Sequence, residues 1–541
     1  MTGQAMPKAD HAAAASASPQ SLTPPPQIEA FQSRVTPYAC WALALLFLTN
    51  LFNYIDRHVV AVVATSIARD LHLSDADLGF LMGTAFATLY GIFGVGMGRI
   101  ADSISRTRLL GSGLIIWSGM TAASGMAFNF VSLASARVGV GIGEAIASPC
   151  SQSLISDYFP ARNRSLAMGI YLAAAPLGGA AAMVIGGAIM QNWATTCATL
   201  PGTLCRLSDW QATFLVMGLP GIILAAIVLA LREPRPRRQV LPTRRIVIRE
   251  LSSTVPPLTF INLFTAGGAQ AIRRNLVLIA GIAAVALSIA ALTGDWLQWI
   301  AIGIGAVSLA SWGQLLRMSD RPLYRLTFGS RTAVYAIIGA ALTGTFSVTF
   351  GAWSMPFAIR ELGASKAQIG AFLGFAGLVA SVSSALIGGI VNDKWKRRDP
   401  RAPVWMALVS MIGPVIPLIV MLQTKSLMTF AVGFFFFQFL ALAWTGAFAA
   451  YIQDSVLPRM RATAAAIFAL VVMLVSLGIG PYAVGKVSQL TGSLTTGVYS
   501  LLVLIPLGTP FLIAAARRVG RETPELRAAW AVEAGEDIST L

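Results

Sequence analysis

Long apolar stretches separated by short polar or basic segments run along the chain from residue 39 onward. Each stretch is close to the roughly 20 residues that a helix needs to cross a hydrocarbon core about 30 Å thick. The pattern therefore predicts an all-α membrane protein. Its fourteen predicted transmembrane helices are 39–64, 77–98, 109–128, 131–152, 165–190, 212–231, 275–293, 296–316, 332–355, 367–391, 403–423, 427–451, 462–484 and 497–516.

The composition supports this prediction. Of the 541 residues, 56% are apolar and only 11% are charged, whereas globular proteins have about 25% charged residues. With a mean hydropathy of +0.70, the chain cannot present a solvated surface if all of it folds in water. A soluble enzyme, a secreted disulfide scaffold and a disordered chain are therefore excluded.

The segments outside the apolar stretches divide the chain. Residues 1–38 are rich in Ala, Ser, Pro and Gln and predict a disordered tail rather than a signal peptide. The segment 275–316 predicts an inserted two-helix hairpin, with an amphipathic pair lying on the membrane surface as the competing interpretation. The predicted order is the tail 1–38, a six-helix bundle 39–231, a basic linker with the hairpin 232–331, a second six-helix bundle 332–516 and a tail 517–541.

Basic residues predict the orientation in the membrane. If the N-terminus is cytoplasmic, most basic residues fall on the cytoplasmic side, which predicts that both termini lie inside. The net charge of +16 then reflects this bias, and no nucleic-acid partner is expected. Arginine outnumbers lysine and alanine is abundant, which suggests a prokaryote and a plasma membrane location, as in a bacterial inner membrane. The few basic residues in the predicted outer loops are Arg69, Arg206, Arg360, Lys366, Lys425 and Lys486.

The chain repeats itself at an offset of 291 residues. Gly98 corresponds to Gly389, Asp102 to Asp393 and Arg106 to Arg397, and at an offset of 297 Asp157 corresponds to Asp454. These residues follow the second and fourth helices of each half. Two six-helix halves in parallel order are therefore predicted.

The loops GRIADSISR (98–106) and GIVNDKWKR (389–397) resemble the loop motif of the major facilitator superfamily. The resemblance implies a transporter whose halves rock about a central cavity. Physically, Asp102 can face the positive end of a neighbouring helix while Arg106 pairs with Asp157. Asp393, Arg397 and Asp454 are expected to repeat this cytoplasmic latch. Ordinary inside-positive loop charge is the alternative interpretation.

One departure from the motif concerns the first latch. Ser103 and Ser105 replace the usual basic residue and glycine. This departure predicts that the latch in the first half is the weaker of the two.

Shorter motifs are similar to the Spinster family of lysolipid transporters. They are NYIDR (53–57), Arg137-x6-Glu144, Arg232-Glu233-Pro234, WSMPFAIRELG (353–363) and GIGPYAVG (478–485). The inserted hairpin is not part of the usual twelve-helix pattern.

Asp56, Arg57, Arg137 and Glu144, with His58 beside them, lie inside predicted spans. Ionisable groups there cost a few kcal/mol each by insertion scales, so each is a functional hypothesis. Burial raises the pKa of a carboxylate and a nearby arginine lowers it, so exchange of an arginine can switch protonation. Glu144 is the expected proton carrier, Asp56 the second candidate, and an anionic headgroup the expected partner of an arginine. A static buried pair is the alternative, and packing or hydrogen bonding is favoured for His58.

The second half has no comparable charges but is rich in aromatic residues, as in GFFFFQFLALAW (433–444). An apolar cavity wall suits a substrate with an acyl chain, although most of these rings are expected to face lipid or other helices. Gln438 and Trp444 are six residues apart and nearly opposite on a helix. The candidate cavity-lining residues are Asn53, Trp353, Gln438, Trp444, Phe448 and Tyr451.

The cysteines and histidines have no metal-ligand spacing, and no nucleophile–base arrangement is visible. No metal and no cofactor are expected. Cys197 and Cys205 share a predicted outer loop, which favours a disulfide in an oxidising compartment. Cys40 and Cys150 lie in spans and are expected to be packing residues.

These observations predict a secondary transporter that moves an amphipathic anionic lipid, such as a lysophospholipid, by alternating access with proton coupling. A proton-coupled drug or organic-anion antiporter of the same superfamily is the alternative within transport. An intramembrane enzyme or a non-transporting receptor is the alternative of another class, against which the duplicated latches argue. We expect a monomer, with a lipid-like substrate and protons as its partners.

Overall fold

The computed structural model describes residues 35–199, 204–234, 247–248, 250–457, 460–519 and 532. Over these residues the secondary structure is helical throughout and contains no strand, which confirms the predicted all-α fold. The predicted tails at 1–38 and 517–541 lie almost entirely outside the described residues.

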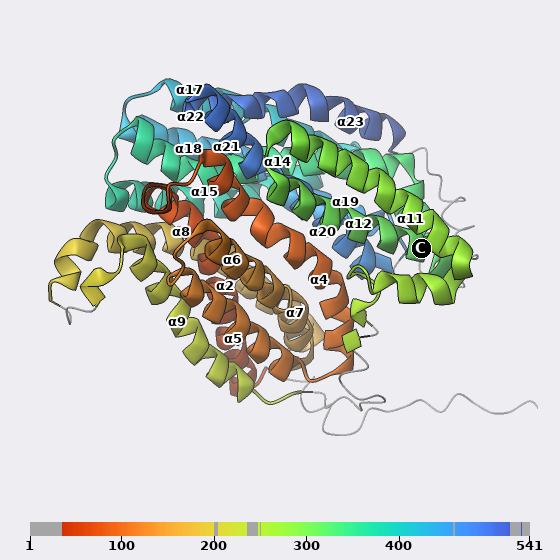
Figure 1. The fold of residues 1–541 in the computed structure, drawn as a ribbon. Helices are drawn as coiled ribbons and strands as arrows, with labels where there is room; N and C mark the ends of the chain where they lie inside the picture. Colours follow the sequence, from red (N-terminus) through yellow and green to blue (C-terminus); the bar gives the residue numbers. More distant parts are fainter. Residues whose placement is uncertain are drawn as a thin grey trace, which may run out of the picture.

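The first half forms six spans, two of which consist of more than one helical segment (Figure 1). The segments α3, η1 and α4 make up the second span, and α6 and α7 make up the fourth. Its elements are α2 (Pro37–Leu71), α3 (Asp75–Gly79), η1 (Phe80–Thr84), α4 (Ala85–Ser103), α5 (Arg106–Ser124), α6 (Phe130–Glu144), α7 (Ala147–Tyr158), α8 (Ala161–Cys197), η2 (Leu204–Arg206) and α9 (Asp209–Leu229).

The second half repeats this arrangement beside the first. The segment pairs α16 and α17, α18 and α19, and α20 and α21 each form one span, while α22, η5 and α23 form the last. Its elements are α14 (Arg331–Glu361), α15 (Lys366–Lys396), α16 (Ala402–Ile412), α17 (Val415–Gln423), α18 (Leu427–Leu442), α19 (Thr445–Asp454), α20 (Arg461–Ser476), α21 (Gly480–Thr491), α22 (Leu494–Tyr499), η5 (Ser500–Val503) and α23 (Leu504–Arg518).

Between the halves, α11 (Thr259–Thr293) and α12 (Trp296–Ser319) form the predicted hairpin, followed by α13 (Arg321–Tyr324) and η3 (Arg325–Gly329). Figure 1 shows this hairpin in green along the edge where the two halves meet. The α12 helix packs on α4, and Gln298 donates a hydrogen bond of 2.9 Å to the carbonyl of Gly478, which follows α20. Both helices have the length and hydropathy of membrane spans, which favours a spanning hairpin over a surface amphipathic pair.

Thirteen helices in the described part of the chain are long and apolar enough to cross a membrane. The remaining predicted span, 109–128, coincides with α5, which contains Gly111, Ser112 and Gly113. Small residues lower its hydropathy and let α9 approach closely: a Cβ on Gly111 would lie 2.5 Å from Cγ of Leu229. The α5 helix is thus a span held by close helix packing.

The two faces of the bundle differ in how the halves meet. We call the face that carries the loops after Gly98 and Gly389 the motif face, and the other end the opposite face. At the opposite face Arg360 Nη1 lies 2.6 Å from Asp75 Oδ1, and Lys366 Nζ lies 2.6 Å from Asp209 Oδ2. Both ion pairs join one half to the other, so the halves are closed at this face.

The hydrophobic core follows the same division. One buried cluster contains residues of both halves, such as Leu78 and Trp353. Two further clusters lie nearer the motif face: one is centred in the first half around Trp117, the other in the second half around Phe448. The halves therefore share a core toward the opposite face and separate toward the motif face.

The structure joins Cys197 to Cys205 at the end of α8, with Cα atoms 5.0 Å apart, within the range that a disulfide spans. Under denaturing, non-reducing conditions we expect a maleimide mass tag to label two cysteines, Cys40 and Cys150, and to label all four after reduction. Gel shifts of protein purified from an oxidising membrane compartment measure this number. Four tags before reduction would contradict the disulfide.

Candidate substrate and coupling site

A break in the fourth span places Glu144 at the end of a helix. Pro149 has no N–H to donate to the carbonyl of Ala145, so the helical ladder is interrupted there. Accordingly α6 ends at Glu144 and α7 begins at Ala147. The second half has the equivalent break between α18 and α19, but the offset of 297 places Ala441 at the position of Glu144. The acid belongs to the first half alone.

Glu144 is paired with Arg57 from α2. Arg57 Nη2 lies 2.9 Å from Glu144 Oε2, and Arg57 Nε lies 3.3 Å from the same oxygen. Glu144 is fully buried, whereas 16% of the Arg57 side chain is exposed. The other carboxylate oxygen, Oε1, has no hydrogen-bond partner among the described residues. Arg57 thus pairs with a buried acid while part of its own side chain stays exposed.

Aromatic rings surround the Arg57 guanidinium. Its Cζ lies 4.9 Å from the ring centroid of Tyr54, 4.8 Å from that of Phe86 and 5.1 Å from that of Tyr90. These cation–π contacts hold the planar group in place while part of its hydrogen-bonding capacity stays unused. His58 stacks on Tyr54, with centroids 6.4 Å apart, and its ring lies beside Gly179, an arrangement that suits packing.

Asp56 of α2 and Arg137 of α6 form a second group, and both side chains are fully buried. Arg137 Nη2 donates a hydrogen bond of 3.2 Å to the backbone carbonyl of Asp56, not to its carboxylate. In the described part of the chain, neither Asp56 carboxylate oxygen has a hydrogen-bond partner, and the same is true of Arg137 Nε and Nη1. The predicted cluster therefore consists of one closed ion pair, Arg57–Glu144, and two buried charged side chains that do not pair directly.

A cavity of about 750 Å³ lies between the halves on the motif side. Tyr90 and Ala145 line its inner end, next to the Arg57–Glu144 pair, while Gln152 and Arg461 lie toward the motif face. Trp312 of the hairpin forms part of its wall. The cavity is within the size range of small-molecule sites, and Tyr90 separates it from Arg57.

The six candidate cavity-lining residues are not among the residues that line this cavity. Trp353 is fully buried, and its indole N–H donates a hydrogen bond of 3.0 Å to the carbonyl of Pro481. Phe448 is also fully buried and stacks on Phe468, with centroids 5.4 Å apart. Asn53 instead belongs to the charge cluster, since its Oδ1 accepts a hydrogen bond of 3.4 Å from Arg57 Nη2. The roles of Gln438, Trp444 and Tyr451 in a substrate cavity stay predictions.

The first latch contains the expected ion pair and an acid that the sequence analysis missed. Arg106 Nη1 lies 2.7 Å from Asp157 Oδ2, and the Arg106 side chain is fully buried. Glu233, which follows the sixth span, also holds Arg106: Oε1 accepts from Nε at 2.8 Å and from Nη2 at 2.5 Å. Its Oε2 accepts from the Arg106 backbone N–H at 2.8 Å and so caps the positive end of α5. The motif Arg232-Glu233-Pro234 was part of the resemblance to the Spinster family, but no contact was predicted for Glu233.

The second latch differs from the expectation. Asp454 pairs with Lys396, Nζ to Oδ2 2.7 Å, and not with Arg397, whose side chain is exposed. Arg397 was the expected partner of Asp454, and Lys396 is its neighbour in the sequence. Adjacent side chains on a helix point about 100° apart, so only one of the two can face Asp454. Both members of this pair are about half exposed, as is typical of a weak surface pair. Asp393 is also exposed.

The structure favours the opposite order of strength, because the pairs of the first latch are largely buried and that of the second is about half exposed. Ser105, which departs from the motif, donates a hydrogen bond of 3.2 Å to Glu233 and caps α5. Of the remaining motif residues, Gly98 lines the cavity and Gly389 has open space beside it. The side chain of Asp102 lies outside the described part of the structure.

The two latches predict different costs of mutation. Glu233→Gln is expected to lower the free energy of unfolding by about 2 kcal/mol, because Arg106 is buried and loses a charged partner. The matched change Asp454→Asn, at the exposed pair, is expected to cost about 0–0.5 kcal/mol. Thermal melting of the purified variants in one detergent compares them. Equal melting temperatures for Glu233→Gln and wild type would contradict this assignment.

Comparisons with known proteins agree with the arrangement of two halves. Residues 46–481 match the model of the Major Facilitator Superfamily. The chain is 28% identical over 494 residues to an "MFS-type efflux pump" of Mycolicibacterium smegmatis, covering 90% of this chain and 91% of that protein. It is 28% identical over 190 residues to a sphingosine-1-phosphate transporter of Xenopus tropicalis, covering 35% of this chain and 34% of that protein.

Among solved structures, a bacterial homologue of the human lysosomal transporter Spinster, in an inward-facing and occupied conformation, has a TM-score of 0.67. That likeness covers 89% of this chain and 97% of the other at 23% sequence identity. It shows that the two chains share a fold.

Proposed function

Since the chain belongs to the major facilitator superfamily and is a transporter rather than an enzyme, we propose that it is a proton-coupled secondary transporter of an amphipathic organic anion. The leading substrate is a lysophospholipid or a sphingolipid phosphate. The Arg57–Glu144 pair carries the proposal, because it places an exchangeable cation and a buried acid at the inner end of a cavity between the halves.

The proposed coupling is an exchange of partners at Arg57. The acidic headgroup of the substrate passes Tyr90 and takes the guanidinium, which has the fork geometry for phosphate or carboxylate. Glu144 then loses its only charged hydrogen-bond donor in the described structure. An ionised carboxylate left unpaired at that depth costs several kcal/mol, so Glu144 takes up a proton. The site is neutral before and after the exchange, which keeps the cost of moving it across the membrane low.

Alternating access uses the two faces of the bundle. The cross-half pairs Arg360–Asp75 and Lys366–Asp209 hold the opposite face closed. The cavity lies between α4 and α7 of the first half and α19 and α20 of the second. In the proposed orientation, with both termini in the cytoplasm, this is an inward-facing state. The latches at Arg106 and Lys396 then lie on the cytoplasmic side and guide its closure.

Two relatives point to different substrate classes. The sphingosine-1-phosphate transporter supports a lipid phosphate, and the small apolar side chains of Ala465, Ala466 and Ala469 on the cavity wall leave room for an acyl chain. The efflux pump matches a much larger share of this chain and favours a second candidate, a drug or organic-anion antiporter. The exchange at Arg57 loads an anion and a proton together and so fits symport, whereas an antiporter needs the substrate and the proton to bind Arg57 and Glu144 in turn.

Uptake of labelled lysophospholipid into proteoliposomes, with and without an imposed pH gradient, tests the proposal. Flux that follows the gradient supports a proton-coupled lipid transporter, whereas flux indifferent to the gradient would contradict the coupling. Absence of lipid flux, together with gradient-driven flux of a short organic acid or a drug, would replace the lipid with the second candidate.

A further inference from the structure

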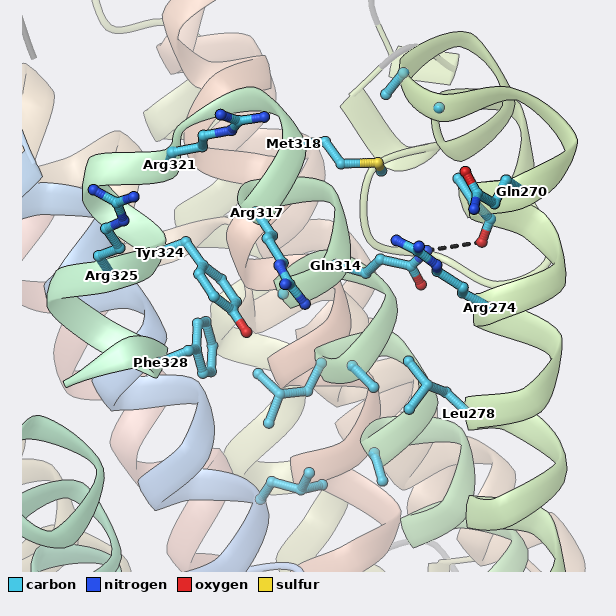
Figure 2. Close-up of a pocket in the computed structure, with 18 residues that line it drawn as sticks. Gln270, Arg274, Leu278, Gln314, Arg317, Met318, Arg321, Tyr324, Arg325 and Phe328 are labelled. Carbon is cyan, nitrogen blue, oxygen red and sulfur yellow. Dashed lines mark hydrogen bonds between the residues drawn. The ribbon is translucent and has the colours of Figure 1, made fainter. Parts of the chain in front are cut away.

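A wide pocket lies between the inserted hairpin and the segment that leads into the second half. Its volume is about 1220 Å³, and its walls come from α11, α12, α13 and η3. In Figure 2, Arg274 of α11 and Arg317 of α12 point toward the same space, and Arg321 of α13, which also lines the pocket, lies higher in the view. The exchange at Arg57 uses none of these residues.

The charged residues that line this pocket are all basic. Arg274, Arg317, Arg321 and Arg325 line it and are exposed, and none of the described lining residues is acidic. The neighbouring carboxylate of Asp320 accepts a hydrogen bond of 3.1 Å from the N–H of Leu323 at the start of α13. Several guanidinium groups around one space repel each other, and an anion bound among them removes that repulsion.

Below the arginines the pocket is apolar. Leu278, Leu309 and Phe328 line it, together with Leu474 of α20. Arg317 also lies over the ring of Tyr324, with Cζ 5.8 Å from the centroid, which orients its guanidinium. A free phosphate ion needs only the charged part of such a pocket. A phospholipid uses both parts, because its headgroup is anionic and its chains are apolar.

The pocket lies at the end of the hairpin, where polar and apolar surfaces meet. On α11 the side chains of Leu276 and Val277 are 50% and 68% exposed, as expected for a helix side that faces lipid. At Gly268, φ is +60° and ψ is −157°, a conformation open essentially only to glycine, and the chain turns sharply there. The lead-in turn before the bend exposes Ile261 and Phe264. Arginines at this depth are at the level of lipid headgroups.

We infer that this pocket binds the headgroup of an anionic membrane phospholipid through Arg274, Arg317 and Arg321, with an acyl chain along Leu278 and Leu309. This lipid is a resident ligand of the hairpin and not the transported substrate. On the other side of α12, Trp312 lines the transport cavity. The bound lipid therefore braces the helix that closes the cavity on the hairpin side.

Lipid binding to the delipidated full-length protein tests the inference. Native mass spectrometry or a fluorescence titration compares phosphatidylglycerol, phosphatidylcholine and inorganic phosphate. The pocket variant is R274Q/R317Q/R321Q, and the matched control R108Q/R331Q/R398Q removes the same charge from exposed arginines that do not line the pocket. All six side chains are exposed, so both variants are expected to fold.

We expect the wild type to bind phosphatidylglycerol on the order of 100-fold tighter than phosphatidylcholine. We expect the pocket variant to lose most of this preference, by about fivefold for each arginine, and the control to keep it. Equal preference in the wild type and the pocket variant would overturn the inference. So would inorganic phosphate that displaces phosphatidylglycerol at equal concentration, because the site would then be a simple anion site. Lysophospholipid transport is measured separately, so failure of the transport proposal leaves this result intact.

Discussion

Glu144→Gln is expected to abolish pH-gradient-driven accumulation of substrate while leaving substrate binding intact or tighter. Glutamine cannot take up or release the proton, so a proton gradient can no longer drive net movement. The same change removes the acid that competes for Arg57, whose Nη2 lies 2.9 Å from Glu144 Oε2. An anionic headgroup then meets an arginine without a charged competitor. The variant mimics the protonated, loaded state of the proposed cycle.

Two transport assays on the same proteoliposomes separate these effects. Gradient-driven uptake should fall to background, whereas exchange of internal for external substrate, which needs no net proton movement, should continue. Asp454→Asn is the matched control, because it makes the same acid-to-amide change at an exposed pair. Full gradient-driven uptake by Glu144→Gln would exclude Glu144 as the proton carrier. If Asp56→Asn alone abolished uptake, the role would move to the second buried acid.

The hydrophobic pattern was sufficient to predict most of the fold because each span must satisfy its own backbone hydrogen bonds in lipid. The hairpin was visible for the same reason: only Gly294 and Asp295 separate its two apolar stretches. The breaks inside spans were not predicted. The break before Ala147 had a local signal in Pro149, whereas no proline lies near the corresponding break between α18 and α19.

Contacts between distant parts of the chain were harder to predict than the positions of the helices. The pair Arg106–Asp157 was expected because the duplicated motif places both residues at the same face. Glu233 is 127 residues from Arg106 and reaches it only because α9 packs along α5 and ends there. Lys396 and Arg397 differ by one position, and the rotation of α15 decides which one meets Asp454. The order of charged residues in the sequence does not predict how a helix is rotated about its own axis.

The pairing of the buried charges at the candidate site was also beyond what the sequence could predict. The sequence identified four buried charges but not how they pair, since Arg57 and Glu144 are 87 residues apart. The adjacent residues Asp56 and Arg57 lie about 100° apart on α2, and the structure places them in different surroundings. One is fully buried and the other is stacked between rings near the cavity. Trp353 is buried in the cluster that the two halves share and Phe448 in the cluster of the second half, whereas the Phe436 side chain is 50% exposed.

Arg57→Gln is expected to weaken binding of an anionic substrate on the order of 100-fold, which corresponds to the loss of a charge-assisted, forked contact of about 2–3 kcal/mol. Arg57→Lys should recover only part of this loss, because a lysine keeps the charge but lacks the planar fork that stacks against Tyr54, Phe86 and Tyr90. Neutral amphipaths, if they bind, should be affected much less. Equilibrium binding of the labelled lysophospholipid and of an uncharged analogue measures the difference.

Removing Arg57 alone also leaves Glu144 buried without its cation, which can destabilise the protein. The double variant Arg57→Gln/Glu144→Gln avoids this, because it replaces the ion pair with two neutral amides. If the arginine holds the headgroup, the double variant should fold like the wild type and still fail to bind the anion. Arg137→Gln supplies the matched comparison, because Arg137 is also buried but contacts the backbone carbonyl of Asp56. Retained anion binding in the double variant, with loss in Arg137→Gln, would transfer the headgroup site to Arg137 and break the proposed link between substrate and proton.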